Sequence, residues 1–275
     1  MSKTLKDVQW FWENNPLWSG ESNFEPGTKA FFEEHRQVYI DDCYGGGLDE
    51  QSFPDEAKAK KILDLGCGPG FWVVEFALHG YQHVIAADLT HNALALARRR
   101  CELYEVKAEF SQQNAERLAF DDATFAHVNC IGVIHHTPNT EACIREIARV
   151  LDLGGTASIS VYYRNIFLRA WPWLKWLGKL LAKVGAGMKG RGRENIYAVE
   201  DVDEIVRLYD GHDNPIGKSY AHNEFISMLA PYFEIQSTYL YFFPARSLPI
   251  KLPKSIHRLL NKYVGFMICA IVNKR

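Results

Sequence analysis

The chain has 275 residues, of which 47% are hydrophobic and 23% charged, a composition typical of a globular protein with room for one α/β domain and an insertion. Its 31 lysines and arginines nearly balance 33 aspartates and glutamates, which gives a formal net charge of −2. A chain this close to neutral has no overall positive field, so we expect no nucleic-acid partner.

Cysteine usage and hydrophobic runs indicate the cellular compartment. Six cysteines are scattered without a Cys-x-x-Cys pair, a pattern that predicts neither a metal site nor a disulfide framework. Acidic residues interrupt the aromatics at the N-terminus, which lacks the apolar core of a signal peptide, and no apolar run has the length of a transmembrane helix. We therefore expect reduced thiols, no metal and a cytoplasmic location.

The first segment, residues 1–55, is predicted to be a helical flap that is rich in aromatic residues. Its helical spacing is carried by Phe31, Phe32, His35, Val38 and Tyr39. Aromatic stripes of this kind usually pack against a core. A flap that precedes the first core strand is also placed to close over a bound ligand.

Residues 56–163 alternate between short apolar runs and helical patterns, which predicts parallel strands joined by crossover helices in a doubly wound sheet. We expect the strands at Ile62–Leu65, His83–Ala87, Ala108–Gln112, Ala126–Ile131 and Thr156–Tyr163. Thr90 is placed to cap a helix that begins at His91. Ligands of such sheets bind beyond the carboxyl ends of the strands.

The pattern changes after the fifth strand. Residues 164–230 are predicted to form a helical insertion, and residues 231–275 to complete the sheet with strands at Phe233–Phe243 and Gly265–Val272. Residues 166–184 read as a basic amphipathic helix in which tryptophans stand beside the lysines Lys175, Lys179 and Lys183. Such a helix either covers the substrate cavity as a lid or lies on a membrane surface.

The run from Ile62 to Gly70 predicts a buried strand that turns tightly into a helix, with backbone N–H groups left to face a ligand. A dinucleotide fingerprint needs a third glycine three positions after Gly68, where this chain has Phe71. Asp64 would repel a pyrophosphate but attract an ammonium or a sulfonium group. The loop therefore favours a zwitterionic or cationic nucleoside over NAD.

Polar residues follow the next two strands. Asp88 comes 22 residues after Gly66, a spacing at which an acid binds the ribose hydroxyls of a nucleoside, although an aspartate here also suits a helix cap. Asn114 and Ala115 directly follow the third strand. There a side-chain acceptor and a backbone N–H would form hydrogen bonds with the edge of an adenine.

The fourth strand is followed by His135 and His136, over the point where the strand order reverses. Histidine titrates near neutrality and can accept a proton from an attacking hydroxyl or amine. A structural role, with the ring packed or bonded to a carbonyl, is equally open for His136 and favoured for His135. Further candidates for a base are Tyr162, Tyr163, Asp210 and His212, each of which also has a structural reading.

These stretches together resemble the class I S-adenosylmethionine-dependent methyltransferases, in particular the branch with ubiquinone and menaquinone biosynthesis enzymes and other small-molecule methyltransferases. The resemblance is carried by Ile62–Gly70, Ala87-Asp88, Asn114–Phe120, Phe125–Pro138 and Arg145–Gly155. It implies a Rossmann-like, seven-stranded sheet with an antiparallel last strand. One departure is Asn114, because this position is commonly aspartate in the family.

The resemblance also implies the cofactor, S-adenosyl-L-methionine, and its binding residues. Asp64 and the glycine loop would face the methionine part, Asp88 the ribose, Asn114 and Ala115 the adenine, and the backbone near Ile131 the methionine amine. The full set assigned to the cofactor is Asp64, Gly66, Cys67, Gly68, Gly70, Asp88, Leu89, Asn114, Ala115 and Ile131.

The expected reaction is in-line methyl transfer to oxygen or nitrogen of a small-molecule acceptor, with His136, His135, Tyr162 and His212 as the catalytic candidates. One alternative is methylation of a membrane quinone or lipid, with peripheral membrane contact through residues 166–184. Another is a regulatory module that binds the cofactor without turnover. The sequence predicts neither the acceptor nor the oligomeric state.

Overall fold

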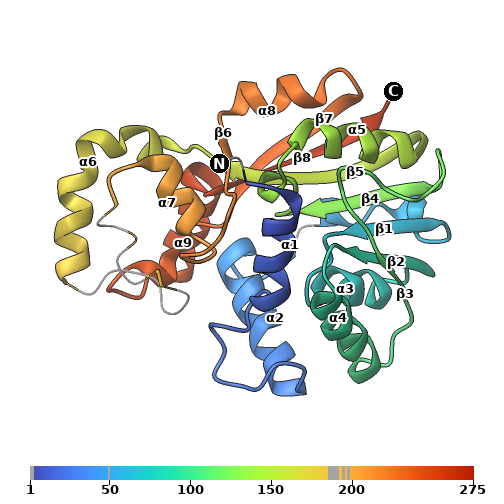
Figure 1. Ribbon diagram of the computed structural model, residues 1–275, viewed down its shortest axis with the longest axis horizontal. Helices are drawn as coiled ribbons and strands as arrows, with labels where there is room; N and C mark the ends of the chain where they lie inside the picture. The colour runs from blue at the N-terminus through green and yellow to red at the C-terminus, as the bar shows by residue number, and fades with distance from the viewer. Residues whose placement is uncertain (1–2, 49, 185–191, 194–195, 197–198) are drawn as a thin grey trace.

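The computed structural model has a central β-sheet covered by helices on both faces (Figure 1). It describes residues 3–48, 50–184, 192–193, 196 and 199–275. Along the sheet the strands follow the order β3-β2-β1-β4-β5-β8-β7, and a short strand, β6, pairs with β5 outside this path. The strands are β1 (Lys61–Leu65), β2 (His83–Asp88), β3 (Glu109–Gln112), β4 (Phe125–Ile131), β5 (Leu151–Tyr163), β6 (Ser219–Tyr220), β7 (Phe233–Tyr241) and β8 (Met267–Lys274).

The strand directions are those of a doubly wound sheet. Strands β3, β2, β1, β4 and β5 run parallel to one another, whereas β8 is antiparallel to both β5 and β7. The predicted fold class, with an antiparallel last strand in a seven-strand path, is therefore confirmed. Strand β6 was not predicted, because two residues carry no recognisable period.

Strand β5 begins at Leu151, five residues earlier than the predicted start at Thr156. Leu151 pairs with Phe125, and the pairing resumes at Thr156 opposite His127 after an irregularity. Gly154 lies in this bulge with a φ of 71°, a conformation that glycine adopts without strain. Gly154 and Gly155 therefore lie inside a bent strand.

Apolar side chains from both sheet faces form two cores. On one face, Leu63 and Val128 pack with Ile144 and Phe225 from helices α5 (Thr140–Val150) and α8 (His222–Leu229). On the other face, strand residues such as Ile62 pack against α2, α3 and α4. These helices are α2 (Lys29–Tyr44), α3 (Phe71–Leu78) and α4 (His91–Leu103). The two cores hold the carboxyl ends of the parallel strands in fixed positions.

The remaining helices come from the two ends of the chain and from the region after β5. Helix α1 (Leu5–Asn14) precedes the core, and α6 (Ile166–Lys183), α7 (Val202–Leu208) and α9 (Lys254–Val264) extend the molecule beyond β5 (Figure 1). No helix among the described residues is long and apolar enough to cross a membrane.

Helix α1 is attached to the core at the start of α4. The Glu13 carboxylate accepts hydrogen bonds from the backbone N–H groups of His91 and Asn92, both at 2.9 Å. Thr90 occupies the N-cap position, but its hydroxyl bonds to Asp88 at 2.9 Å and does not cap the helix. The predicted side-chain cap by Thr90 is therefore wrong, since a residue of the N-terminal helix satisfies these N–H groups instead.

Candidate active site

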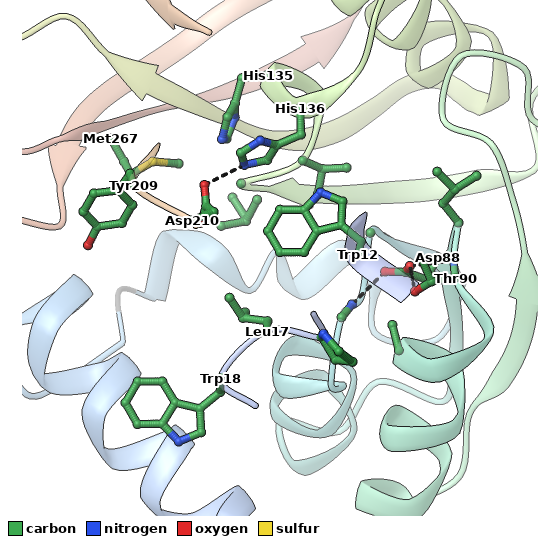
Figure 2. A pocket seen from close by; sticks show the side chains of 18 of the residues that line it. Trp12, Leu17, Trp18, Asp88, Thr90, His135, His136, Tyr209, Asp210 and Met267 are labelled. Carbon is green, nitrogen blue, oxygen red and sulfur yellow. Dashed lines mark hydrogen bonds and ion pairs between the residues drawn. The ribbon is translucent and has the colours of Figure 1, made fainter. Parts of the chain in front are cut away.

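A cavity of about 270 Å³ lies at the carboxyl ends of the parallel strands. One part is lined by residues that follow β1, β2, β3 and β4, and the other by residues of the N-terminal segment, β5 and the segments beyond it (Figure 2). The predicted site residues that line it are Gly66, Gly68, Asp88, Leu89, Asn114, Ala115, Ile131, His135, His136, Tyr162 and Asp210. Asp64, Cys67, Gly70, Tyr163 and His212 are not among its lining residues.

The glycine loop after β1 is already hydrogen-bonded within the protein. The N–H groups of Gly66 and Cys67 both donate to the carbonyl of Ala87, at 2.7 and 3.0 Å. The Gly68 N–H donates to Asp88 Oδ2 at 3.0 Å, and the Gly70 N–H to the Cys67 carbonyl. The expectation that these N–H groups are left for a ligand is therefore wrong. The loop instead provides room for a ligand to approach the backbone closely.

Two glycines of the loop have different physical roles. Gly70 has a φ of 76°, and a Cβ there would lie 2.9 Å from Ala97 Cα, so this glycine allows α4 to pack against the loop. Gly68 has a φ of 50°, lines the cavity, and would place a Cβ where no atom lies within 4 Å. Gly70 is thus required for packing, whereas Gly68 keeps space open in the cavity.

This contrast makes a prediction. We expect Gly70→Ala to lower the free energy of unfolding by about 1–3 kcal/mol, because the methyl group meets backbone that cannot withdraw. Gly68→Ala should cost only about 1 kcal/mol of backbone strain but weaken cofactor binding. Thermal unfolding and cofactor titration of both variants measure the two effects. A Gly68→Ala protein that binds the cofactor normally would contradict the assignment.

Asp88 stands at the end of β2 and lines the cavity. Its Oδ1 accepts hydrogen bonds from the N–H and the hydroxyl of Thr90, both at 2.9 Å, and its Oδ2 accepts from Gly68. Burial raises the pKa of this carboxyl, and the hydrogen bonds from Thr90 and Gly68 oppose that rise. Since a carboxylate has about four lone-pair sites and three are used, one remains for a ligand hydroxyl.

Asp64 is a buried acid on β1, two residues before the loop. Its Oδ1 accepts from Asn129 Nδ2 at 2.7 Å, while its Oδ2 has no hydrogen-bond partner among the described residues. Burial raises the pKa of Asp64 to about 7, the Asn129 hydrogen bond opposes the rise, and the Asp88 charge adds to it. A buried carboxylate near a cavity favours a cationic ligand over an anionic one.

The expected adenine contacts lie after β3. Asn114 and Ala115 line the cavity, together with Gln113. The Asn114 Oδ1 accepts from the N–H of Glu116 at 3.0 Å, so part of its acceptor capacity holds the turn. Gln113 is fixed in the same way, because its amide oxygen accepts from the N–H of Ala119 at 2.9 Å. Sequence reasoning did not select Gln113.

His136 faces Asp210 in the other part of the cavity (Figure 2). His136 Nδ1 lies 2.8 Å from the carbonyl of Ile216, which can only accept, so Nδ1 carries the proton. His136 Nε2 lies 3.3 Å from Asp210 Oδ2, and the Tyr162 hydroxyl donates to the same oxygen at 2.5 Å. The carboxylate therefore orients both rings.

The other catalytic candidates differ in position. His135 is buried beside His136, with ring centroids 4.1 Å apart, and its Nδ1 has no hydrogen-bond partner among the described residues. Burial and the neighbouring His136 hold the pKa of His135 well below its usual value, so its ring is neutral. His212 has an exposed side chain and lies outside the cavity lining, because the turn at Gly211 directs Asp210 inward instead.

The N-terminal segment, predicted only as a helical flap rich in aromatic residues, contributes side chains to the cavity. Leu5, Val8 and Trp12 of α1 line it, and the Trp12 ring lies 5.2 Å from that of His136. The turns after α1 add Leu17 and Trp18 (Figure 2). The period of the aromatic residues indicated a flap, but it could not specify which of them reach the cavity.

The fold and the cavity define the class of protein. An open doubly wound sheet places a glycine loop and an acid at the end of β2 around one cavity, and a second, buried acid lies on β1 two residues before the loop. The space above Gly68, the remaining lone pair of Asp88 and the unpaired oxygen of Asp64 suit a nucleoside with a positively charged group. They are less suited to a pyrophosphate, which two nearby carboxylates would repel.

Comparison with known proteins agrees with this class. Residues 62–155 match the family model described as a methyltransferase domain. Over 131 residues the chain is 30% identical to the ubiquinone biosynthesis O-methyltransferase of Alkalilimnicola ehrlichii, covering 47% of this chain and 49% of the relative. The corresponding enzyme of Aliivibrio fischeri is 33% identical over 108 residues, 39% of this chain and 46% of the relative. The chain thus spans about half the length of the curated relatives it matches.

Solved structures share the fold. An S-adenosylmethionine-dependent methyltransferase of Methanosarcina mazei superposes with a TM-score of 0.54 at 21% identity, over 79% of this chain and 93% of that chain. The cyclase SpnF superposes with the same TM-score of 0.54 at 13% identity, over 100% of this chain and 97% of that one. Residues 62–155 thus match a methyltransferase domain, and S-adenosyl-L-methionine is the cofactor that this match and the shared fold imply.

Proposed function

We propose that this chain transfers the methyl group of S-adenosylmethionine to an oxygen or nitrogen of a small-molecule acceptor. One observation carries the proposal: a single cavity connects the predicted cofactor residues with the His136–Asp210 pair. The names of the curated relatives, which are O-methyltransferases, favour oxygen as the methylated atom.

The cofactor supplies an activated methyl group, and the protein has to hold the acceptor in line with it. Asp88 and the turn at Asn114 and Ala115 would hold the nucleoside, and the buried charge of Asp64 would favour its cationic end. An acceptor hydroxyl in the space beside His136 would pass its proton to the Asp210 carboxylate as it attacks, because both ring nitrogens of His136 already have partners. Tyr162 acts through Asp210 as a positioning residue, because its own hydroxyl already donates to that carboxylate.

A screen for product formation tests the function. The protein is incubated with S-adenosylmethionine and a panel of small hydroxy and amino compounds, and S-adenosylhomocysteine is measured. With an acceptor in hand, Asp210→Asn should lower kcat by roughly 100-fold or more while cofactor affinity stays unchanged, because only the proton acceptor is impaired. Full activity of this variant would remove the pair from the mechanism.

A regulatory module without turnover is the alternative outcome of the same screen. It would be supported by tight cofactor binding without product for any acceptor. The cavity does not favour it, because the glycine loop, Asp88 and the His136–Asp210 pair all line the same space.

A second candidate, methylation of a membrane-bound acceptor, is favoured by helix α6. Its side chains at positions 173, 176, 177 and 180 form an apolar stripe at helical spacing, with Trp173 76% and Trp176 63% exposed. None of the cavity-lining residues belongs to α6 within the described parts of the chain. An exposed apolar stripe with tryptophans suits the surface of a bilayer better than it suits water. Lys175 and Lys179 both pair with Glu200, which reduces their attraction to anionic lipids.

Liposome co-sedimentation tests this candidate. We expect the double variant Trp173→Ser, Trp176→Ser to bind vesicles at least several-fold more weakly than the unmodified protein, because the stripe loses its two largest apolar groups. Trp10→Ser is the matched control, since Trp10 on α1 is 63% exposed but lies outside the stripe. Absence of vesicle binding by the unmodified protein, even at low salt, would remove the candidate.

A further inference from the structure

The cavity contains a cluster of four charged side chains from four separate segments. Glu21 precedes α2, Asp42 lies near its end, Arg193 is in the insertion and Arg246 follows β7. Glu21 Oε1 lies 3.3 Å from Arg193 Nη2, and its Oε2 lies 3.2 Å from Arg246 Nη1. Arg246 also forms an ion pair with Asp42 through Nε. Glu21 thus bridges the two guanidinium groups with one oxygen on each.

The two arginines are held in place by other contacts. The Arg193 side chain is 2% exposed, and its Nη1 donates to the carbonyl of Tyr209 at 2.8 Å. The Arg246 guanidinium lies 5.1 Å from the centre of the Trp18 ring. A buried guanidinium is costly to leave without an anion, and planar guanidinium groups are well matched to a carboxylate. The pair is therefore a preorganised carboxylate site.

Glu21 differs from its partners in how it is held. It lies between α1 and α2, where residues 15–28 form turns and bends without helix or strand. Its segment also covers the cavity through Leu17 and Trp18. Replacement of Glu21 by another carboxylate leaves the charge of the cluster unchanged, because two arginines would still face two anions. The displaced Glu21 side chain would move into water, so its carboxylate would not stay buried without a partner.

We propose that the methyl acceptor carries a carboxylate that binds between Arg193 and Arg246 in place of Glu21. The rest of this cavity region is lined by Trp18, Tyr209 and Phe242, so the body of the acceptor is aromatic or otherwise apolar. Its methylated group then lies toward His136, away from the acid. This inference rests on the proposed methyl-transfer function and specifies the substrate class of the same site.

Matched ligand pairs test the proposal. The full chain, saturated with S-adenosylhomocysteine, is titrated calorimetrically with salicylate, protocatechuate and caffeate, each against its neutral amide. We expect at least one acid to bind at least about tenfold more tightly than its amide, a difference of about 1.4 kcal/mol. Glu21→Gln should strengthen binding of that acid, since the competing carboxylate is gone. Arg193→Lys should remove most of the preference, because an ammonium lacks the fixed fork by which Arg193 donates to the Tyr209 carbonyl and to one carboxylate oxygen at the same time.

The controls separate this inference from the proposed function. Glu25→Gln alters an exposed acid of the same segment and should leave acid binding unchanged. S-adenosylhomocysteine binding by every variant reports folding and an intact cofactor site, so its loss in the unmodified protein would count against the proposed function instead. Three results, each with intact cofactor binding, would overturn the proposal of an acidic acceptor. They are no binding of any acid at millimolar concentration, equal binding of acids and amides, and no effect of Glu21→Gln on acid binding.

Discussion

Substitution of Asp88 by alanine is expected to weaken binding of S-adenosylmethionine by roughly 100-fold or more, because hydrogen bonds to a charged group contribute about 1.5–3 kcal/mol each. The loss has two parts. The ligand loses an acceptor for its ribose hydroxyls, and Gly68 and Thr90 lose the carboxylate to which they donate. Isothermal titration calorimetry with S-adenosylmethionine measures the change.

Two further variants make this result specific. Asp121→Ala removes an exposed aspartate far along the chain from the glycine loop and should leave the affinity unchanged. Asp88→Asn keeps one carbonyl acceptor and should fall between the alanine variant and the unmodified protein. Equal affinities of Asp88→Ala and the unmodified protein would refute the cofactor site.

The second large effect concerns Asp64, whose pKa burial raises to about 7 from a usual value near 3.8. An acid that binds its proton more tightly when folded makes the folded state most stable at low pH, and this contribution is lost as pH rises from about 4 to about 7. Above that range the ionised carboxylate destabilises the fold by about 1.4 kcal/mol for each unit of pKa difference. We therefore expect Asp64→Asn to be more stable than the unmodified protein at about pH 8, by up to a few kcal/mol.

Cofactor binding should respond in the opposite sense. A cationic ligand favours the ionised form of Asp64, so affinity for S-adenosylmethionine should rise with pH up to about pH 7 and then level off. Asp64→Asn should bind more weakly and lose this part of the pH dependence, while gaining stability. Urea unfolding and calorimetry at several pH values give both quantities. A variant that is less stable than the unmodified protein at about pH 8 would show that the carboxylate is not destabilised by burial.

The Asn129 side chain makes this substitution a fair test. It donates to Asp64 Oδ1 at 2.7 Å, and an amide at position 64 can still offer an oxygen to that donor. The change therefore removes a titratable charge and keeps the hydrogen bond. Asp121→Asn serves as the control for changing an exposed aspartate that has no such burial.

Local features of the sequence were enough to predict the architecture of the core. Alternating apolar runs and helical periods located the parallel strands, because burial on both sheet faces requires nearly continuous apolar residues. The glycine loop and Asp88 could be found by spacing alone, since both sit within one strand–helix–strand unit. The misplaced start of β5 reflects a bulge, whose extra residues disturb the period on which such predictions depend.

The tertiary structure decided which of the predicted groups are available for chemistry. In the folded chain the loop N–H groups donate to Ala87, Asp88 and Cys67, and Asp210 rather than His212 lies beside His136. It also gathered Glu21, Arg193 and Arg246 from distant parts of the chain. Sequence periodicity encodes which face of an element is buried, and spacing encodes short loops. Contacts between side chains more than a hundred residues apart depend on how the N-terminal segment and the insertion pack on the sheet, and no local pattern carries that information.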